Sequence, residues 1–179
     1  MTIRDTIDAN WQREVNYLKS LVKSPSDNPP GDCAPIAEVA AKGLESLGFT
    51  VERHPVPQAL VAANGMKSVT NLIVRKSFGS GKGPVIALNA HGDVVPPGAG
   101  WTVDPYGAIE KNGALYGRGV AVSKSDFATF AFALLALESN TSGLNGVVEL
   151  HFTFDEEAGG MIGPKWLIDQ KLTKPTLAI

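Results

Sequence analysis

The sequence His91-Gly92-Asp93 directly follows a short apolar segment, residues 85–90, that is expected to be a strand. Open α/β sheets build their ligand sites at the carboxyl ends of strands, so an imidazole and a carboxylate here could take part in chemistry. Residues two apart on an extended chain share a face, which lets Asp93 bond one ring nitrogen of His91 while the other faces a metal ion. Taken alone, the motif also fits an ordinary surface loop.

A second apolar segment, residues 147–154, ends in three consecutive acids, Asp155, Glu156 and Glu157. Their mutual repulsion costs free energy unless cations compensate it, so one carboxylate could bind a metal ion while its neighbour accepts a proton from water. The alternative is a helix N-terminus, where the helix dipole favours acids. Together the two motifs offer His, Asp and Glu ligands that suit zinc, which generates a nucleophile from water near neutral pH.

Helical and β patterns alternate around these motifs. Segments with helical apolar spacing or helix-forming composition are residues 4–23, 34–47, 123–139 and 161–171. Short β-branched segments expected to be strands are residues 49–56, 69–78, 85–90, 147–154 and 176–179. The alternation predicts an α/β fold, a three-layer αβα sandwich with a mixed, mostly parallel sheet.

Three details refine this prediction. The apolar residues of the first helix (Ile7, Trp11, Val15, Leu18 and Val22) predict an amphipathic helix. Residues 24–31 are expected to be a loop because they combine Pro, Gly, Asn and Asp. The glycine-rich residues 79–83 do not fit a phosphate-binding loop, since Lys82 is followed by glycine, and are expected to be a hairpin-like connection.

Composition limits the function classes. A chain of 179 residues with 44% apolar and 19% charged residues suits one globular domain. A net charge of -2 without a basic stripe argues against nucleic acid and membrane surfaces as partners. Cys33 is the single cysteine, which excludes an internal disulfide and a zinc site built on cysteine pairs. The N-terminus lacks the apolar core of a signal peptide, so a cytoplasmic location is expected.

Further stretches complete a recognisable pattern: Trp101 with Asp104-Pro105-Tyr106, Leu115-Tyr116-Gly117-Arg118-Gly119, and Gly159-Gly160 after the acids. With the two motifs, they resemble the co-catalytic zinc amidohydrolases and metallopeptidases that include acetylornithine deacetylase, succinyl-diaminopimelate desuccinylase, aminoacylase and glutamate carboxypeptidase. The resemblance covers essentially the whole chain in order and spacing. It implies a phosphorylase/hydrolase-like fold and zinc-dependent hydrolysis of an amide bond in an N-acyl amino acid or small peptide, as a deacylase or carboxypeptidase.

The resemblance also implies roles for particular residues. His91 is similar to the ligand of one zinc ion, with Asp93 orienting its ring, and Glu157 to a ligand of the other zinc ion. Glu156 is similar to the general base that takes a proton from water and delivers it to the leaving amine. Two zinc ions per subunit are implied, with cobalt or manganese as possible substitutes. Arg118 lies between two glycines, and we expect it to have a structural role near the site by pairing with a local carboxylate.

One position departs from the family pattern. The aspartate that bridges both zinc ions in the family corresponds to Val122, and valine cannot bind a metal ion. Asp126 lies about one helical turn further on and could face the same side. Three readings follow: Asp126 replaces the bridge, a single zinc ion binds, or the site is degenerate. We favour Asp126 as the substitute, although an acid in the first turn of a helix explains it equally well.

The resemblance implies that residues 1–179 are the N-terminal portion of the catalytic domain, truncated before the lid or dimerisation domain and the C-terminal part. The isolated chain is therefore expected to be inactive, and a homodimer is expected only through the absent domain. The alternative is a non-catalytic relative that keeps the fold as a binding module because Val122 replaces the bridging ligand. A nucleotide-binding domain is disfavoured because the required glycine patterns are missing.

Overall fold

The computed structural model describes residues 2–179. The main elements are α1 (Ile3–Val22), α2 (Ala34–Ser46), β1 (Val51–Pro55), α3 (Gln58–Ala63), β2 (Thr70–Phe78), β3 (Val85–His91), β4 (Ile109–Lys111), β5 (Ala114–Tyr116), α4 (Lys124–Glu138), β6 (Gly146–Thr153), the 3₁₀ turn η1 (Glu156–Ala158), α5 (Pro164–Asp169) and β7 (Leu177–Ala178). The expected long helices and strands are confirmed within a few residues. The sequence did not predict α3 or the β4–β5 hairpin.

Five strands form a mixed sheet in the order β1-β2-β6-β3-β7. Strands β6, β3 and β7 are parallel neighbours, whereas β1 pairs with β2, and β2 with β6, in antiparallel fashion. The hairpin-like connection expected at residues 79–83 is wrong, because β6 lies between β2 and β3. The apolar β6 thus takes the central place in the sheet and buries both of its faces.

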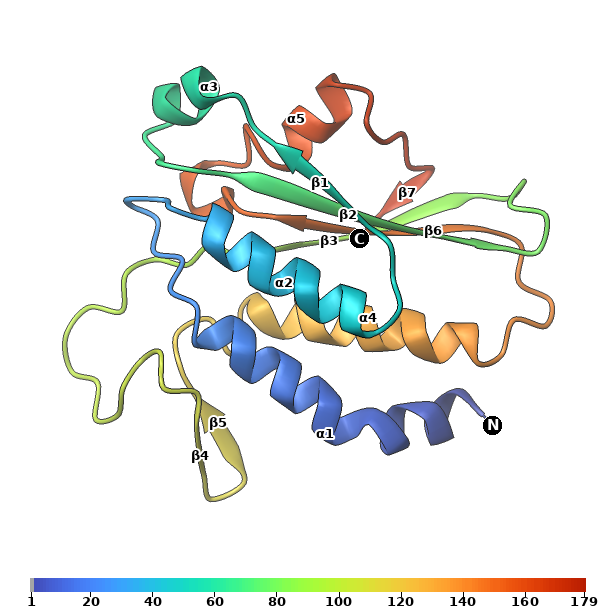
Figure 1. Ribbon diagram of the computed structural model, residues 1–179, viewed down its shortest axis with the longest axis horizontal. Helices are drawn as coiled ribbons and strands as arrows, with labels where there is room; N and C mark the ends of the chain where they lie inside the picture. Colours follow the sequence, from blue (N-terminus) through green and yellow to red (C-terminus); the bar gives the residue numbers. More distant parts are fainter. Residues whose placement is uncertain (1) are drawn as a thin grey trace.

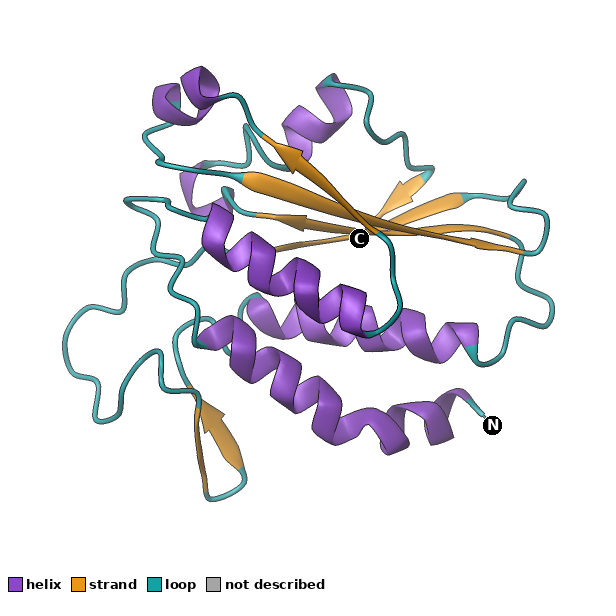
Figure 2. Ribbon diagram, viewed as in Figure 1, coloured by secondary structure: helices purple, strands orange, loops and turns teal. Residues whose placement is uncertain are grey.

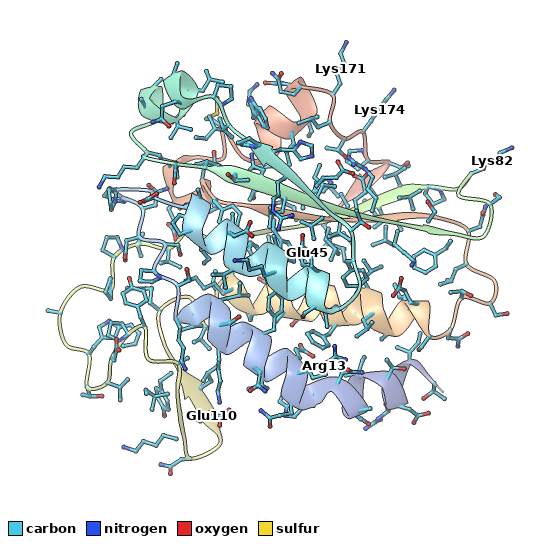
Figure 3. The ribbon with its side chains drawn as sticks, viewed as in Figure 1. Arg13, Glu45, Lys82, Glu110, Lys171 and Lys174 are labelled. Carbon is cyan, nitrogen blue, oxygen red and sulfur yellow. The ribbon has the colours of Figure 1, made fainter. Side chains whose placement is uncertain are left out.

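Helices cover both faces of the sheet and make the three expected layers (Figures 1 and 2). Helices α2 and α4 lie on one face, and α1 forms an outer layer that packs mainly against α4. Helix α5 lies on the opposite face. The β4–β5 hairpin stands apart from the main sheet and is tied to α1 by Lys19 and Glu110, whose charged atoms lie 2.9 Å apart (Glu110 is labelled in Figure 3).

The hydrophobic core lies between the sheet and the helices α2 and α4. The rings of Phe127 on α4 and Phe152 on β6 stack with centroids 3.8 Å apart, and Phe154 meets Phe127 edge-on at 5.7 Å. All three side chains are fully buried. Stacked and edge-to-face aromatic pairs add to the free energy gained by burial alone, so this triplet anchors α4 beneath the end of β6.

Helix α1 buries only part of the face that its apolar pattern suggests, since Val22 is fully buried and Leu18 packs against the core. Trp11 is 62% exposed and Ile7 37% exposed, while Thr6 and Tyr17 are buried. The Tyr17 hydroxyl donates to the carbonyl of Ala40 on α2, which fixes the rotation of α1 about its axis. The apolar stripe is therefore buried at the C-terminal end of α1 and exposed at its N-terminal half. Within residues 2–179, no helix is both long and apolar enough to cross a bilayer.

Candidate metal centre

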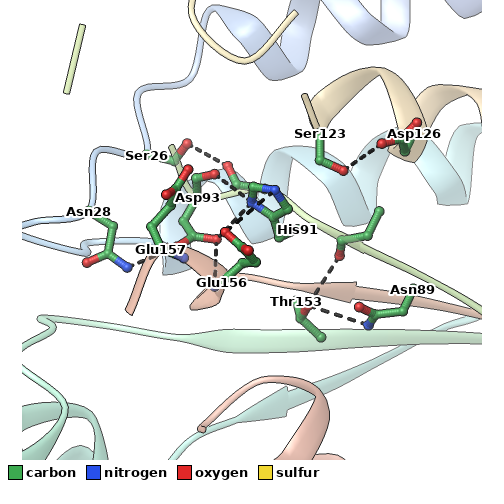
Figure 4. A network of polar contacts seen from close by, with 12 residues as sticks. Ser26, Asn28, Asn89, His91, Asp93, Ser123, Asp126, Thr153, Glu156 and Glu157 are labelled. Carbon is green, nitrogen blue, oxygen red and sulfur yellow. Dashed lines mark hydrogen bonds and ion pairs between the residues drawn. The ribbon is translucent and has the colours of Figure 1, made fainter. Parts of the chain in front are cut away.

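The two chemical motifs meet at the carboxyl ends of two parallel strands. His91 is the last residue of β3, and its register partner Thr153 is the last residue of β6, two residues before the acids begin. One side-chain atom each from His91, Glu156 and Glu157 can bind a metal ion, and these atoms lie within 4.8 Å of one another (Figure 4). The parallel pairing of β3 and β6 therefore brings together residues 65 positions apart.

The ring of His91 is held in one orientation. Its Nδ1 lies 3.0 Å from the main-chain carbonyl oxygen of Asp93 and 3.4 Å from that residue's carboxylate. A carbonyl only accepts hydrogen bonds, so Nδ1 carries the proton in this contact and Nε2 presents its lone pair toward Glu156, 4.0 Å away. Burial lowers the pKa of His91, but the hydrogen bond and charge of Asp93 outweigh it and leave the pKa raised.

Asp93 is a fully buried carboxylate that organises both motifs. Its two oxygens accept the backbone N–H groups of Glu156 and Glu157, at 3.2 and 3.1 Å, and one also accepts the side-chain amide of Asn28 at 2.9 Å. Burial raises the pKa of Asp93, but these partners and His91 outweigh it, so the pKa is lowered. The carboxylate thus fixes the turn of the two glutamates more directly than it fixes the imidazole ring.

The three acids also lie at the start of a short helical turn, which agrees with the helix N-terminus that their sequence offers as the alternative. η1 starts at Glu156 directly after Asp155. Asp155 is buried, and its carboxylate accepts the N–H of Ile162 at 2.7 Å, which shapes the following loop. Burial raises the pKa of Asp155. Glu156 and Glu157 remain exposed, so these two carboxylates are accessible to a ligand.

Gly92 is required by the packing beneath the site. A Cβ atom at this position would lie 2.6 Å from the ring of Phe154 and 3.0 Å from that of Phe127. Both aromatic residues belong to the core triplet, so the backbone between His91 and Asp93 rests directly on the core. A side chain at residue 92 would lift both site residues away from it.

Two site residues were missed by the sequence analysis, which treated residues 24–31 only as a loop. The Ser26 hydroxyl donates to the carbonyl of Gly92 at 2.6 Å, and the Asn28 amide reaches Asp93. Both residues are buried. They lie 65 or more positions before their partners, and no spacing rule links a polar residue in a proline-rich loop to a strand end so far along the chain.

Val122 and Asp126 lie at the start of α4. Val122 is 68% exposed, and its hydrocarbon side chain offers no metal ligand. The carboxylate of Asp126 accepts a hydrogen bond from the Ser123 hydroxyl at 2.7 Å, and Asp126 does not belong to the group of ligand atoms formed by His91 and the two glutamates (Figure 4). Asp126 thus lies in the first turn of α4 and binds the side chain of the residue before that helix.

The expected carboxylate partner of Arg118 is not observed among residues 2–179. The guanidinium donates to the carbonyl of Pro96 at 3.1 Å and lies 5.8 Å from the ring centre of Trp101. These contacts join the loop after β3 to the segment before α4. Arg118 thus ties two parts of the site's rim together through a carbonyl and an aromatic ring.

Comparison with known proteins defines the class of the fold, which is that of metallopeptidase catalytic domains. The chain superposes on human carnosine dipeptidase 1 with a TM-score of 0.72 and 26% identity, over 94% of this chain and 37% of that one. An M20 family metallo-carboxypeptidase from Sulfolobus solfataricus shares the fold, with a TM-score of 0.73 and 22% identity over 93% of this chain and 36% of that one.

Residues 87–178 match Peptidase family M20/M25/M40, and the chain belongs to this family. It is 34% identical over 155 residues to the succinyl-diaminopimelate desuccinylase of Acidiphilium cryptum (strain JF-5), which covers 87% of this chain and 37% of that protein. The chain therefore spans well under half the length of the relatives it matches.

The donor set of the cluster fits one divalent cation. It combines one imidazole nitrogen, fixed by a hydrogen bond to the other ring nitrogen, with two carboxylates, and these are ligand types that zinc accepts. Around Val122, the described residues do not form a second such group. Among residues 2–179, the cluster of His91, Glu156 and Glu157 is therefore the one group of three ligand side chains.

Proposed function

We propose that this chain carries part of the active site of a metal-dependent hydrolase that cleaves an amide bond. The observation that supports this best is the cluster of His91, Glu156 and Glu157, held by the buried carboxylate of Asp93. Relatives named as a desuccinylase and as a dipeptidase support amide-bond chemistry. The proposed substrate is an N-acyl amino acid or small peptide.

In this proposal, His91 and Glu157 bind zinc, for which cobalt or manganese could substitute. A cation at this position supplies Lewis acidity toward a carbonyl group and water. The carboxylate of Glu156 takes a proton from the attacking water and returns it to the leaving amine. Its side chain is 62% exposed, so solvent and substrate can reach it. Asp93 holds Glu156 and Glu157 in place through their N–H groups.

A second candidate is a non-catalytic binding module. The observation that favours it is Val122, a 68% exposed hydrocarbon side chain at the position where the family resemblance implies a bridging aspartate. Since residues 2–179 hold one group of three ligand side chains, we expect at most one tightly bound zinc ion per chain. We propose that turnover by residues 1–179 is low, and that full activity and homodimerisation belong to a polypeptide as long as the relatives.

Metal binding and turnover together test the proposal. Native mass spectrometry should show one zinc ion per chain, and His91→Ala should lose it. In a polypeptide as long as the relatives, Glu156→Gln should keep the zinc ion and lose at least about 100-fold in the rate of hydrolysis of N-acyl amino acids or dipeptides. Zinc binding without any turnover by that longer polypeptide, with Glu156 unchanged, would favour the binding module. Absence of zinc binding would overturn the metal centre itself.

A further inference from the structure

A short segment of the loop after α1 runs alongside the His91 motif. The N–H of Val94 donates to the carbonyl of Ser26 at 3.0 Å, and the N–H of Asn28 donates to the carbonyl of Val94 at 2.8 Å. This backbone pairing resembles one step of a parallel ladder, with Asp27 facing Val94. The segment is thereby fixed relative to the chain that carries the metal ligands.

The side chain of Asn28 extends this contact into the site. It is 6% exposed, and its amide nitrogen lies 2.9 Å from the carboxylate of Asp93. The amide group is the one side-chain hydrogen-bond donor that this carboxylate has besides the imidazole of His91. The backbone N–H groups of Glu156 and Glu157 supply the other contacts, so four groups from three chain segments converge on Asp93.

We propose that Asn28 is a positioning residue of the metal centre: it sets the orientation of the Asp93 carboxylate and, through it, of His91, Glu156 and Glu157. This inference rests on the proposed function, because it assumes that the cluster binds a divalent cation. Asn28 itself does not touch the cation in this proposal. It acts on a carboxylate that in turn holds three of the groups expected to contact the cation or the water.

The physical reason is the number of constraints on a buried carboxylate. A carboxylate can rotate about its last bond, and the backbone N–H groups of Glu156 and Glu157 each bind one of its oxygens. The Asn28 amide comes from another chain segment and adds a third constraint, on the oxygen that Glu157 also binds. Hydrogen bonds to a charged group in a buried setting are stronger than neutral ones, and they are costly to lose. Partners of this kind commonly change metal affinity about 10–100-fold when they are mutated.

The test measures Co²⁺ affinity and the visible absorption spectrum of bound Co²⁺ in the whole protein. Asn28→Ala and Asn28→Val both remove the amide donor, but they leave different volumes at the site. We expect both variants to weaken Co²⁺ binding by about 10–100-fold and to alter the spectrum to the same extent. Asn71→Ala is the matched control, because Asn71 is also fully buried and donates its amide to the carbonyl of Ile162 at 2.8 Å. That control should lose stability but keep the affinity and spectrum.

The outcomes distinguish the existence of the metal centre from the positioning role of Asn28. Failure of the unchanged protein to bind Co²⁺ or Zn²⁺ would overturn the metal centre, and the role of Asn28 with it. Binding by the unchanged protein with unchanged affinity and spectrum in the Asn28 variants would overturn the positioning role alone. Recovery of affinity in Asn28→Val compared with Asn28→Ala would overturn it as well, since packing would then be the cause. If one of the two variants does not fold, the other decides by the same measurement.

Discussion

The two faces of the main sheet are built from opposite kinds of side chain. Alternate residues of β2 and β6 point to opposite faces. On the side of α2 and α4, the buried ones are apolar and include Leu72, Val74, Leu150 and Phe152. On the side of α5, they include Asn71, Arg75, Glu149 and His151. Figure 1 shows that the apolar face carries the long helices and the polar face the short helix α5.

The polar face is held together by specific pairs. The carboxylate of Glu149 lies 2.8 Å from Arg75 and 2.8 Å from His151, and it also accepts a hydrogen bond from Thr173 in the loop after α5. The other Arg75 nitrogens reach Glu52 and the carbonyl of Leu172. Apolar contacts are non-directional, whereas each buried polar group needs its own partner. The apolar face therefore stabilises the fold by burying apolar side chains. The polar face fixes the position of the loop after α5 through specific pairs.

The largest expected effect comes from the apolar face. Phe152→Ala removes the ring stacked on Phe127 and leaves a cavity, so we expect the free energy of unfolding to fall by about 4 kcal/mol. Phe152→Leu keeps most of the volume and should cost less than half as much. Urea unfolding followed by circular dichroism measures both values. A loss below about 1 kcal/mol for the alanine variant would mean that this face is not the main source of stability.

The next effect is expected on the polar face. Glu149→Ala leaves Arg75 with Glu52 as its one carboxylate partner among the described residues and removes the acceptor of the buried His151, so it should cost about 3 kcal/mol in urea unfolding. The double variant Arg75→Met with Glu149→Leu replaces the charged pair by apolar side chains and should recover much of this loss. If the double variant is less stable than Glu149→Ala, the pair contributes net stability. The polar face would then stabilise the fold as the apolar face does.

Lys124 tests the difference between the two faces, because it is a charged side chain on the apolar side of the sheet. It is fully buried, and its ammonium donates to the carbonyls of Leu21 and Ser24 at 3.1 and 3.0 Å. Burial lowers the pKa of Lys124 to about 8, and the charges of Asp27 and Cys33 act in the opposite direction. The unfolded chain keeps this proton up to its ordinary pKa near 10.5, so between these values it binds more protons than the folded protein.

Stability should therefore rise with pH through this window, relative to a protein without the lysine. We expect the unchanged protein to gain about 2 kcal/mol over Lys124→Met between about pH 7 and about pH 9.5 in urea unfolding. Comparing the two proteins cancels the contributions of groups that do not interact with Lys124, such as the buried Tyr17. A difference that is constant with pH would show that the two carbonyls keep the ammonium charged, as polar partners do on the opposite face.

Much of the fold could be predicted from local patterns. The strands β3 and β6 are recognisable in the sequence because they are short and rich in apolar and β-branched residues. The strand order could not be predicted in the same way. The insertion of β6 between β2 and β3 depends on long-range pairing, and the short turn at residues 79–83 is compatible with either arrangement.

For the site, sequence motifs located His91 and the two glutamates because both motifs follow strand ends. The support beneath them was not predictable. Asn28 lies in a proline-rich loop, and Gly92 is set by the rings of Phe127 and Phe154, which approach it from α4 and β6. Arg118 was expected to meet a carboxylate and instead meets the carbonyl of Pro96. Such contacts depend on how distant segments pack, which no local spacing records.

The smallest expected effect concerns the outer side of α1, which lies beyond the apolar layer. The apolar spacing of this helix suggested that Trp11 packs inward, but its side chain is 62% exposed and borders a groove with Leu115 of the β4–β5 hairpin. Trp11→Ser should therefore change the free energy of unfolding by no more than about 0.5 kcal/mol, as is usual for exposed positions. Tyr17→Phe is the informative partner, because it removes the buried hydrogen bond to the carbonyl of Ala40 and should cost about 1 kcal/mol. A large loss for Trp11→Ser with a negligible loss for Tyr17→Phe would mean that α1 is rotated so that its apolar stripe faces the protein, and that burial rather than a polar anchor orients this helix.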